Sequence, residues 1–162
     1  MRRIEPGLGQ ESVWDYPRPP VIERVSKHIR VMFAGEVIAE TDEAIRYLET
    51  SHPPTYYIPR QDVRSKFLEP SERTTHCEWK GEAHYVSVRV GERFARDAAW
   101  YYPQPRLAYA ALADHLAFYP QMMDECSVDG EVVRPQEGSF YGGWITSNIV
   151  GPFKGAQDTM GW

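Results

Sequence analysis

The sequence predicts a mainly β (β-rich α+β) fold, and three observations lead to that class. Short runs in which apolar and polar residues alternate recur between residues 21 and 133, and a period of two is typical of strands with one buried face. Glycine and proline residues interrupt these runs at short intervals, as turns do between antiparallel strands. Helical spacing is confined to two short segments, 42–49 and 107–114.

The expected strands share a short apolar or alternating run that is bounded by turn signals. Gly35, Gly91 and Gly130 lie in such signals, and each predicts a hairpin between its flanking runs. The expected strands are residues 21–25, 29–33, 36–40, 55–58, 67–68, 85–90, 93–102 and 115–119, followed by a hairpin over 125–133.

Two short helices are expected among these strands. Asp42–Glu49 follows a threonine that can cap it, has acidic residues at its start and spaces its apolar residues for one buried face. Leu107–Asp114 is rich in alanine, the residue with the highest helix propensity. We therefore predict helices over these two ranges.

The chain divides into three regions. Residues 1–20 are rich in proline near their end and are expected to form an irregular N-terminal arm. Residues 21–133 are expected to form a single β-rich domain. Residues 134–162 interleave six glycines with five aromatic residues. A disordered tail would rarely carry so many rings, so we predict an ordered, irregular C-terminal strap packed over the domain.

Composition and charge exclude several classes of function. The formal net charge is −5 and no stretch clusters Lys and Arg, so we expect no nucleic-acid partner. No apolar run approaches about 18 residues, which argues against a membrane span. Residues 1–10 lack the basic-then-apolar pattern of a signal peptide, so the expected location is the cytoplasm. Cys77 and Cys126 are too few for a cysteine-rich zinc site, so we expect free thiols, no bound metal and no cofactor.

The stretch from Thr74 to Tyr85 concentrates reactive side chains. It holds two histidines, one cysteine and one lysine within twelve residues. We interpret its first part as a loop and turn that lead into the strand 85–90. Loops held by a sheet are frequent places for binding and catalytic groups, so the sequence predicts a functional site here.

One chemistry for this site is acid/base catalysis by two carboxylates. Glu49 and Asp62 flank the strand 55–58 and are candidates for catalytic residues. With aromatic residues as stacking surfaces, a sugar-like substrate would fit and the reaction would be glycosidic hydrolysis. The alternative is structural, because acids at the end of a helix or at the cap of a turn are common. The stacking residues would be Tyr57, Tyr85, Trp100 and Tyr102.

A second chemistry uses a nucleophile from the reactive stretch. Cys77 could act with His76 or His84 as its base, although neighbours on a strand point to opposite faces, which argues against His76. Lys80 could form an imine with a carbonyl, or it could clamp an anion. The alternatives are that Cys77 is a small buried hydrophobic residue and that Lys80 is a solvated lysine of the turn before Gly81.

We predict that five residues line one pocket, with Glu49 or Asp62 at its edge. The turn at Gly91 makes 85–90 and 93–102 neighbours, and the period of two puts their rings on one face. This prediction depends on strand register, because a shift of one residue sends a ring to the other face. The alternative is that the rings form a solid core. The five residues are Tyr57, Lys80, Tyr85, Trp100 and Tyr102, and His76 and Cys77 are further candidates for ligand contacts.

Several short motifs follow one another along the chain. Their order is Glu49-Thr50-Ser51-His52-Pro53-Pro54-Thr55-Tyr56-Tyr57-Ile58-Pro59, Asp62-Val63, Thr74-Thr75-His76-Cys77, Lys80-Gly81, Tyr85, Trp100, Tyr102-Pro103 and Ala117-Phe118-Tyr119. In this order they resemble the bacterial family called domain of unknown function 427, over about residues 13–133. The segment that follows is similar to the extension of actinobacterial members. The resemblance implies a compact fold similar to the β-tent class, in which two small antiparallel sheets lean together. Some β-tent relatives bind zinc through paired Cys-x-x-Cys motifs, which this sequence lacks.

The leading hypothesis is a cytoplasmic β-rich domain whose aromatic pocket binds a small polar, sugar-like molecule, with glycosidic hydrolysis as its reaction. One alternative is a non-catalytic ligand-binding or interaction module. Another is a small-molecule enzyme that depends on Lys80 or Cys77. The carboxyl positions separate the first two hypotheses: a pair that faces across a cleft at about 5–10 Å favours hydrolysis, and a pocket lined only by rings favours binding.

Overall fold

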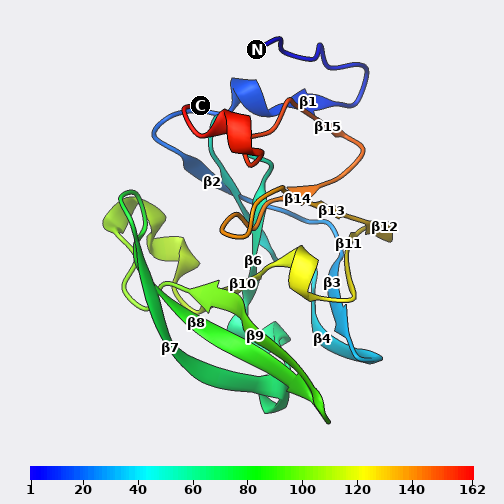
Figure 1. Cartoon of the computed structure of the whole chain (residues 1–162), viewed down its shortest axis with the longest axis vertical. Coiled ribbons are helices and arrows are strands. Elements are labelled where there is room, and N and C mark those ends of the chain that lie inside the picture. Colours follow the sequence, from blue (N-terminus) through cyan, green and yellow to red (C-terminus); the bar gives the residue numbers. More distant parts are fainter.

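The computed structural model describes residues 1–162, except for the side chain of Gln157. The fold is mainly β, as the sequence predicts, with fifteen strands and six short 3₁₀ helices. Two antiparallel sheets make up most of the molecule (Figure 1). No helix among the described residues is long and apolar enough to cross a membrane.

The strands are β1 (Glu11–Ser12), β2 (Val21–Arg24), β3 (Ile29–Phe33), β4 (Glu36–Thr41), β5 (Ile45–Leu48), β6 (Thr55–Pro59), β7 (Leu68–Cys77), β8 (Gly81–Val90), β9 (Arg93–Tyr101), β10 (His115–Phe118), β11 (Glu125–Val128), β12 (Glu131–Val132), β13 (Arg134–Pro135), β14 (Trp144–Ile145) and β15 (Ile149–Val150). The 3₁₀ helices are η1 (Val13–Asp15), η2 (Arg60–Asp62), η3 (Ser65–Phe67), η4 (Leu107–Leu112), η5 (Pro120–Met122) and η6 (Gln157–Thr159).

The two main sheets are built from hairpins. The larger sheet has seven strands in the order β2-β5-β6-β10-β9-β8-β7, and the smaller has four in the order β12-β11-β3-β4. Gly35, Gly91 and Gly130 join β3 to β4, β8 to β9 and β11 to β12, and all three have a positive φ, which glycine adopts without strain. Two short pairings, β13 with β14 and the parallel pair β1 with β15, hold the terminal regions.

The main core lies between these two sheets. Side-chain alternation along the seven-stranded sheet sends Ile58, Val88 and Phe118 into this core, where they join Val31 of β3. Trp144 of β14 completes the core from the strap. Its side chain is fully buried, and its indole Nε1 donates a hydrogen bond to the carbonyl oxygen of Phe118 at 3.1 Å. The strap therefore contributes directly to the packing of the sheets.

The opposite face of the seven-stranded sheet carries a second cluster, which is aromatic. Tyr57 and Tyr85 neighbour core residues in the sequence, so they point away from the main core. The 3₁₀ helix η4 packs on this face through Tyr109 and Leu112. The other buried members are Ile45, Tyr47, Ala83, Trp100, Tyr102, Ala117 and Tyr119.

The prediction of a helix over Asp42–Glu49 is wrong, because no residue of this segment is helical and half of it, Ile45–Leu48, forms strand β5. Ile45 and Tyr47 are buried in the aromatic cluster, while Arg46 between them is only partly buried. This is the period of two expected of a strand. β5 pairs with β2 on one side and β6 on the other, and these tertiary pairings override the helical spacing of the segment.

Two other expected elements differ in detail. The second predicted helix, Leu107–Asp114, is the 3₁₀ helix η4, which is interrupted by a non-helical conformation at Tyr109. The residues Thr74 to Cys77, which we expected in a loop, belong to the long strand β7. β7 lies at the edge of the sheet, where its irregular register between Pro70 and Thr74 accommodates the proline.

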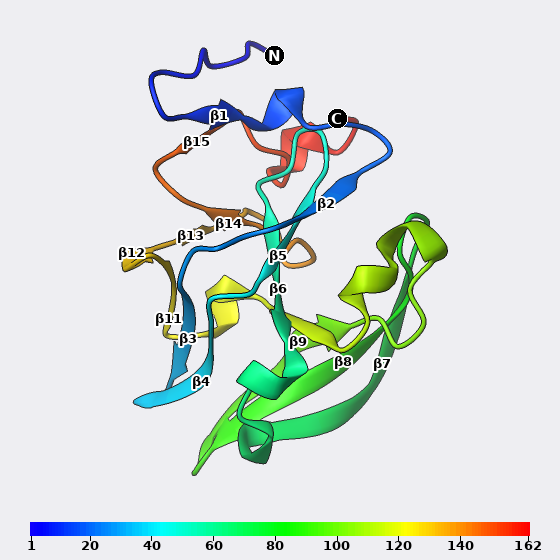
Figure 2. The same cartoon turned by 180° about the vertical axis from the view of Figure 1, so that it is seen from behind.

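The N-terminal arm and the end of the strap meet at one end of the molecule (Figure 2). Glu11 of β1 lies opposite Ile149 of β15 in their parallel pairing. The indole Nε1 of Trp14 donates a hydrogen bond to the carbonyl oxygen of Pro152 at 2.8 Å. The arm is thus paired with the strap.

Candidate functional site

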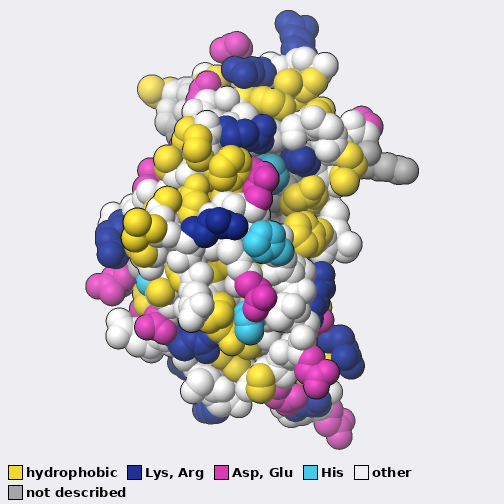
Figure 3. Space-filling model, turned by 90° about the vertical axis from the view of Figure 1, so that its left-hand side faces the viewer, with side chains coloured by type: hydrophobic (Ala, Val, Ile, Leu, Met, Phe, Trp, Pro, Cys, Tyr) yellow, Lys and Arg dark blue, Asp and Glu magenta, His cyan; other side chains and the backbone are white. Residues whose placement is uncertain are grey.

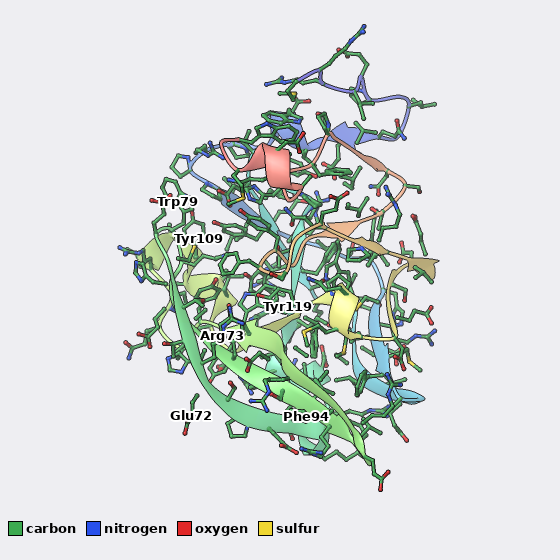
Figure 4. All side chains as sticks on the ribbon, viewed as in Figure 1. Glu72, Arg73, Trp79, Phe94, Tyr109 and Tyr119 are labelled. Carbon is green, nitrogen blue, oxygen red and sulfur yellow. The ribbon has the colours of Figure 1, made fainter. Side chains whose placement is uncertain are left out.

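The candidate site is a cavity of about 170 Å³ over the aromatic face of the seven-stranded sheet. Its walls come from the β5–β6 turn, from the β7–β8 turn with the strands behind it, and from strap residues 140–142. Tyr109 on η4 and Tyr119 after β10 belong to the same aromatic cluster (Figure 4). On the side of the molecule that carries β7 and η4, basic, acidic, histidine and apolar side chains lie together (Figure 3).

Lys80 brings a positive charge into this cavity. It precedes Gly81, whose φ of +110° favours glycine and turns the chain sharply into β8. The carbonyl oxygen of Lys80 accepts a hydrogen bond from the backbone N–H of Arg106 at 3.0 Å, which fixes the turn. The lysine side chain therefore points inward, and the residue is only 8% exposed.

The Lys80 ammonium is surrounded by tyrosines. Its Nζ donates a hydrogen bond to Tyr57 Oη at 3.2 Å and lies 3.8 Å from the ring centroid of Tyr47 and 5.2 Å from that of Tyr102. Burial raises the pKa of Tyr47 and Tyr102 far above their usual value, so both hydroxyls are neutral. Among the described side chains, no carboxylate lies within 4.0 Å of Lys80 Nζ.

Strand register places the supporting rings in one row across the sheet. Tyr85 lies opposite Trp100, Trp100 lies opposite Ala117, and Ala117 lies opposite Tyr57. The small side chain of Ala117 leaves room for the two rings beside it to meet. Trp100 Nε1 donates a hydrogen bond to Tyr57 Oη at 3.3 Å, so this hydroxyl accepts from both Trp100 and Lys80.

Glu49 and His52 form a second polar part of the cavity, in the turn between β5 and β6. The backbone N–H of His52 donates to the carbonyl oxygen of Glu49 at 3.0 Å, which keeps the two residues close. The carboxylate of Glu49 lies 3.9 Å from Arg18, and its side chain is 21% exposed. Burial lowers the pKa of His52 below its usual value, although the Glu49 carboxylate acts in the opposite direction.

The strap forms the third wall. Tyr119 Oη donates a hydrogen bond to the carbonyl oxygen of Phe140 at 3.0 Å, and Gln121 Nε2 donates to that of Tyr141 at 3.1 Å. Gly142 lies directly on the Trp100 ring, where a β-carbon would collide with it. These contacts hold the strap backbone against the aromatic face.

Comparison with known proteins identifies the region that carries most of this cavity. The profile of one family, described as a domain of unknown function (DUF427), matches residues 21–129. The chain belongs to this family. No curated protein matches the chain. Glu49, His52 and Lys80 lie inside the DUF427 match, whereas the strap wall lies beyond it.

Most residues that the sequence analysis assigned to the site lie at the cavity of this DUF427 protein. Of the residues expected at the site, those that line the cavity are Glu49, His76, Cys77, Lys80, Tyr85, Trp100 and Tyr102. Tyr57 is fully buried beneath it and supports Lys80 through its hydroxyl. Cys77 is half-buried, and its Sγ accepts a hydrogen bond from the backbone N–H of Lys80 at 3.5 Å.

Asp62 does not line this cavity. Its position corrects the expectation that Glu49 and Asp62 form a carboxylate pair at one end of the strand. Its carboxylate accepts a hydrogen bond from Thr41 Oγ1 at 2.7 Å. Glu49 precedes β6 and Asp62 follows it, so the length of this strand separates them. Four residue steps at about 3.3 Å make roughly 13 Å for the strand alone.

Several residues of the cavity were not expected from the sequence. Tyr47 was assigned to a helix, and its true strand brings it under Lys80. His52 was named only within the longest motif that resembles the DUF427 family, without a role of its own. Tyr119, Gln136 and Tyr141 also line the cavity, and their contacts depend on long-range packing. Within the described side chains, no group of three or more His, Cys, Asp or Glu residues could hold a metal ion.

Proposed function

We propose that the cavity binds a small, ring-shaped molecule that carries a negative charge, with Lys80 as its charged contact. The single observation that supports this proposal is the buried Lys80 ammonium, which has tyrosine neighbours and no carboxylate of the described residues within 4.0 Å. A buried charge without a counter-charge is unfavourable, and an anionic ligand would supply one.

The size and lining of the cavity support a single ring as the body of the ligand. The cavity has about 170 Å³, and a cavity of about 150 Å³ is known to hold one benzene ring. Trp100, Tyr119 and Tyr141 provide flat surfaces on which such a ring, including a sugar ring, would pack. A sugar-like acid therefore satisfies both the charge and the shape.

The same geometry favours binding over hydrolysis of a glycosidic bond. Two-carboxylate hydrolysis needs a second acid facing the first across the substrate. Glu49 is the one carboxylate among the described residues of the cavity wall. The tyrosine faces around Lys80 attract a charged ammonium, which favours an anion clamp over an imine-forming amine.

Calorimetric titration with matched pairs of ring compounds tests this function. The acids are glucuronate and cyclohexanecarboxylate, and their uncharged counterparts are glucose and cyclohexanol. We expect the acids to bind about 10–100-fold more tightly, because a hydrogen bond to a charged group contributes about 1.5–3 kcal/mol. Lys80→Met should remove this preference.

Lys66→Met is the matched control, since Lys66 is exposed and lies outside the cavity. It makes the same charge change and should leave the preference for acids intact. Equal affinity of the unmodified protein for acids and neutral compounds would reject the proposed function. An acid preference that persists in Lys80→Met would reject the role of Lys80.

A further inference from the structure

We propose that the ligand is a cyclic hydroxy acid, in which Lys80 receives the carboxylate and His52 accepts a hydrogen bond from a ring hydroxyl. This inference rests on the proposed function and adds a second polar contact to it. The two contacts lie among different rings of the cavity: Lys80 lies over Tyr47, whereas the His52 ring lies edge-on to Tyr141 with centroids 5.6 Å apart.

The hydrogen bonding of His52 fixes which ring nitrogen can accept. His52 Nδ1 lies 3.0 Å from the carbonyl oxygen of Thr50. A carbonyl oxygen only accepts, so Nδ1 carries the proton and donates. In the neutral imidazole this leaves the lone pair on Nε2, and the lowered pKa of His52 keeps the ring neutral near pH 7.

His52 Nε2 is free to meet a ligand. It has no hydrogen-bond partner among the described residues, and His52 lines the cavity. Among the side chains that the structure describes, the fully enclosed polar atoms without a partner are Tyr16 Oη, Tyr47 Oη and Ser51 Oγ. His52 Nε2 is not one of them, so it keeps accessible surface. An accessible acceptor in a partly closed cavity matches an O–H donor.

Glu49 strengthens the preference for a ligand whose ring carries hydroxyl groups. An ionised carboxylate only accepts hydrogen bonds, and it lies in the same turn as His52. The charged groups around His52 are Glu49, Arg18 and Lys154. Two neighbouring acceptors favour a ring with hydroxyls over a plain hydrocarbon ring, because a hydrocarbon would leave both without donors.

The test compares glucuronate with cyclohexanecarboxylate, two ring acids that differ in their hydroxyls. We expect the unmodified protein to prefer glucuronate. His52→Phe keeps an aromatic ring against Tyr141 but removes the acceptor, so it should reduce this preference roughly three- to tenfold. The affinity for cyclohexanecarboxylate should stay unchanged, which a purely structural role of His52 would not produce.

His115→Phe is the matched control variant. His115 makes the same kind of contact, with Nδ1 2.8 Å from the carbonyl oxygen of Ala113, but it lies outside the cavity. It should leave the preference for glucuronate unchanged. If both acids bind equally well and still better than glucose and cyclohexanol, this inference fails while the proposed function stands. If no acid is preferred over its neutral counterpart, the proposed function itself fails.

Discussion

Two small residues determine where the rings of the cavity can lie. Ala117 separates Trp100 from Tyr57 in one row of the sheet and leaves space for the hydrogen bond between them. Gly142 lets the strap backbone lie against the Trp100 ring. A larger side chain at position 117 would push apart Trp100 and Tyr57, and Tyr57 supports Lys80. A larger side chain at position 142 would push the strap wall away from the cavity.

Gly142→Ala should destabilise the protein by about 1–3 kcal/mol, because its new methyl group overlaps the Trp100 ring. Gly161→Ala is the control, since a β-carbon there meets no atom within 4 Å. The measurement is the urea midpoint of each variant. Equal midpoints for both variants would show that the strap does not rest on Trp100 in solution.

At the scale of elements, the strap is part of the core and not only a cover for the cavity. Trp144 is fully buried between the sheets, with its ring centroid 4.9 Å from that of Tyr56. Phe140, four residues earlier, is 54% exposed. The same segment therefore contains one ring that packs in the core and one that borders solvent.

Trp144→Ala should reduce the free energy of unfolding by about 3–5 kcal/mol, as expected for truncation of a buried tryptophan. Phe140→Ala should change it by no more than about 0.5 kcal/mol, because its ring is largely exposed. Thermal unfolding followed by circular dichroism measures both. A similar small effect for the two variants would contradict the burial of Trp144.

The sequence predicted those elements whose signals are local. Gly91 and the alternation around it predicted the hairpin of β8 and β9, and the structure pairs Tyr85 with Trp100 within it. β5 was not predictable in this way, because its four residues fit helical spacing and only pairing on both sides selects a strand. The strap wall was not predictable at residue level, because Gly142 meets Trp100 only through tertiary packing.

At the scale of the whole molecule, exposed charged pairs connect its separate elements. The ring of His28 bridges two carboxylates, with Nδ1 2.8 Å from Asp42 and Nε2 2.7 Å from Glu40. It thereby joins the chain before β3 to the end of β4. Arg93 of the larger sheet pairs with Asp124, which precedes β11 of the smaller sheet, at 2.8 Å.

His28→Asn should lower stability more at acidic pH than at alkaline pH. The hydrogen bonds that the His28 ring donates to Asp42 and to Glu40, with Asp42 the larger cause, raise the pKa of His28 above its usual 6.5. The stabilisation is therefore complete below pH 6.5 and is lost as pH rises through the raised value. Urea midpoints at pH 5.5 and pH 9 measure the difference between the variant and the unmodified protein. A difference that grows toward pH 9 would contradict this sign.

The dependence of the core on Trp144 also has a consequence for synthesis on the ribosome. Residues 21–129 supply every strand of both main sheets except β12, and they are made before the segment that completes their packing. At about 5–20 residues per second, the chain needs roughly 1–3 s to extend from residue 129 to residue 144. During that interval the nascent sheets lack Trp144 between them, and Trp100 has no backbone over its ring. During this period the nascent chain exposes aromatic surface that the finished strap later covers.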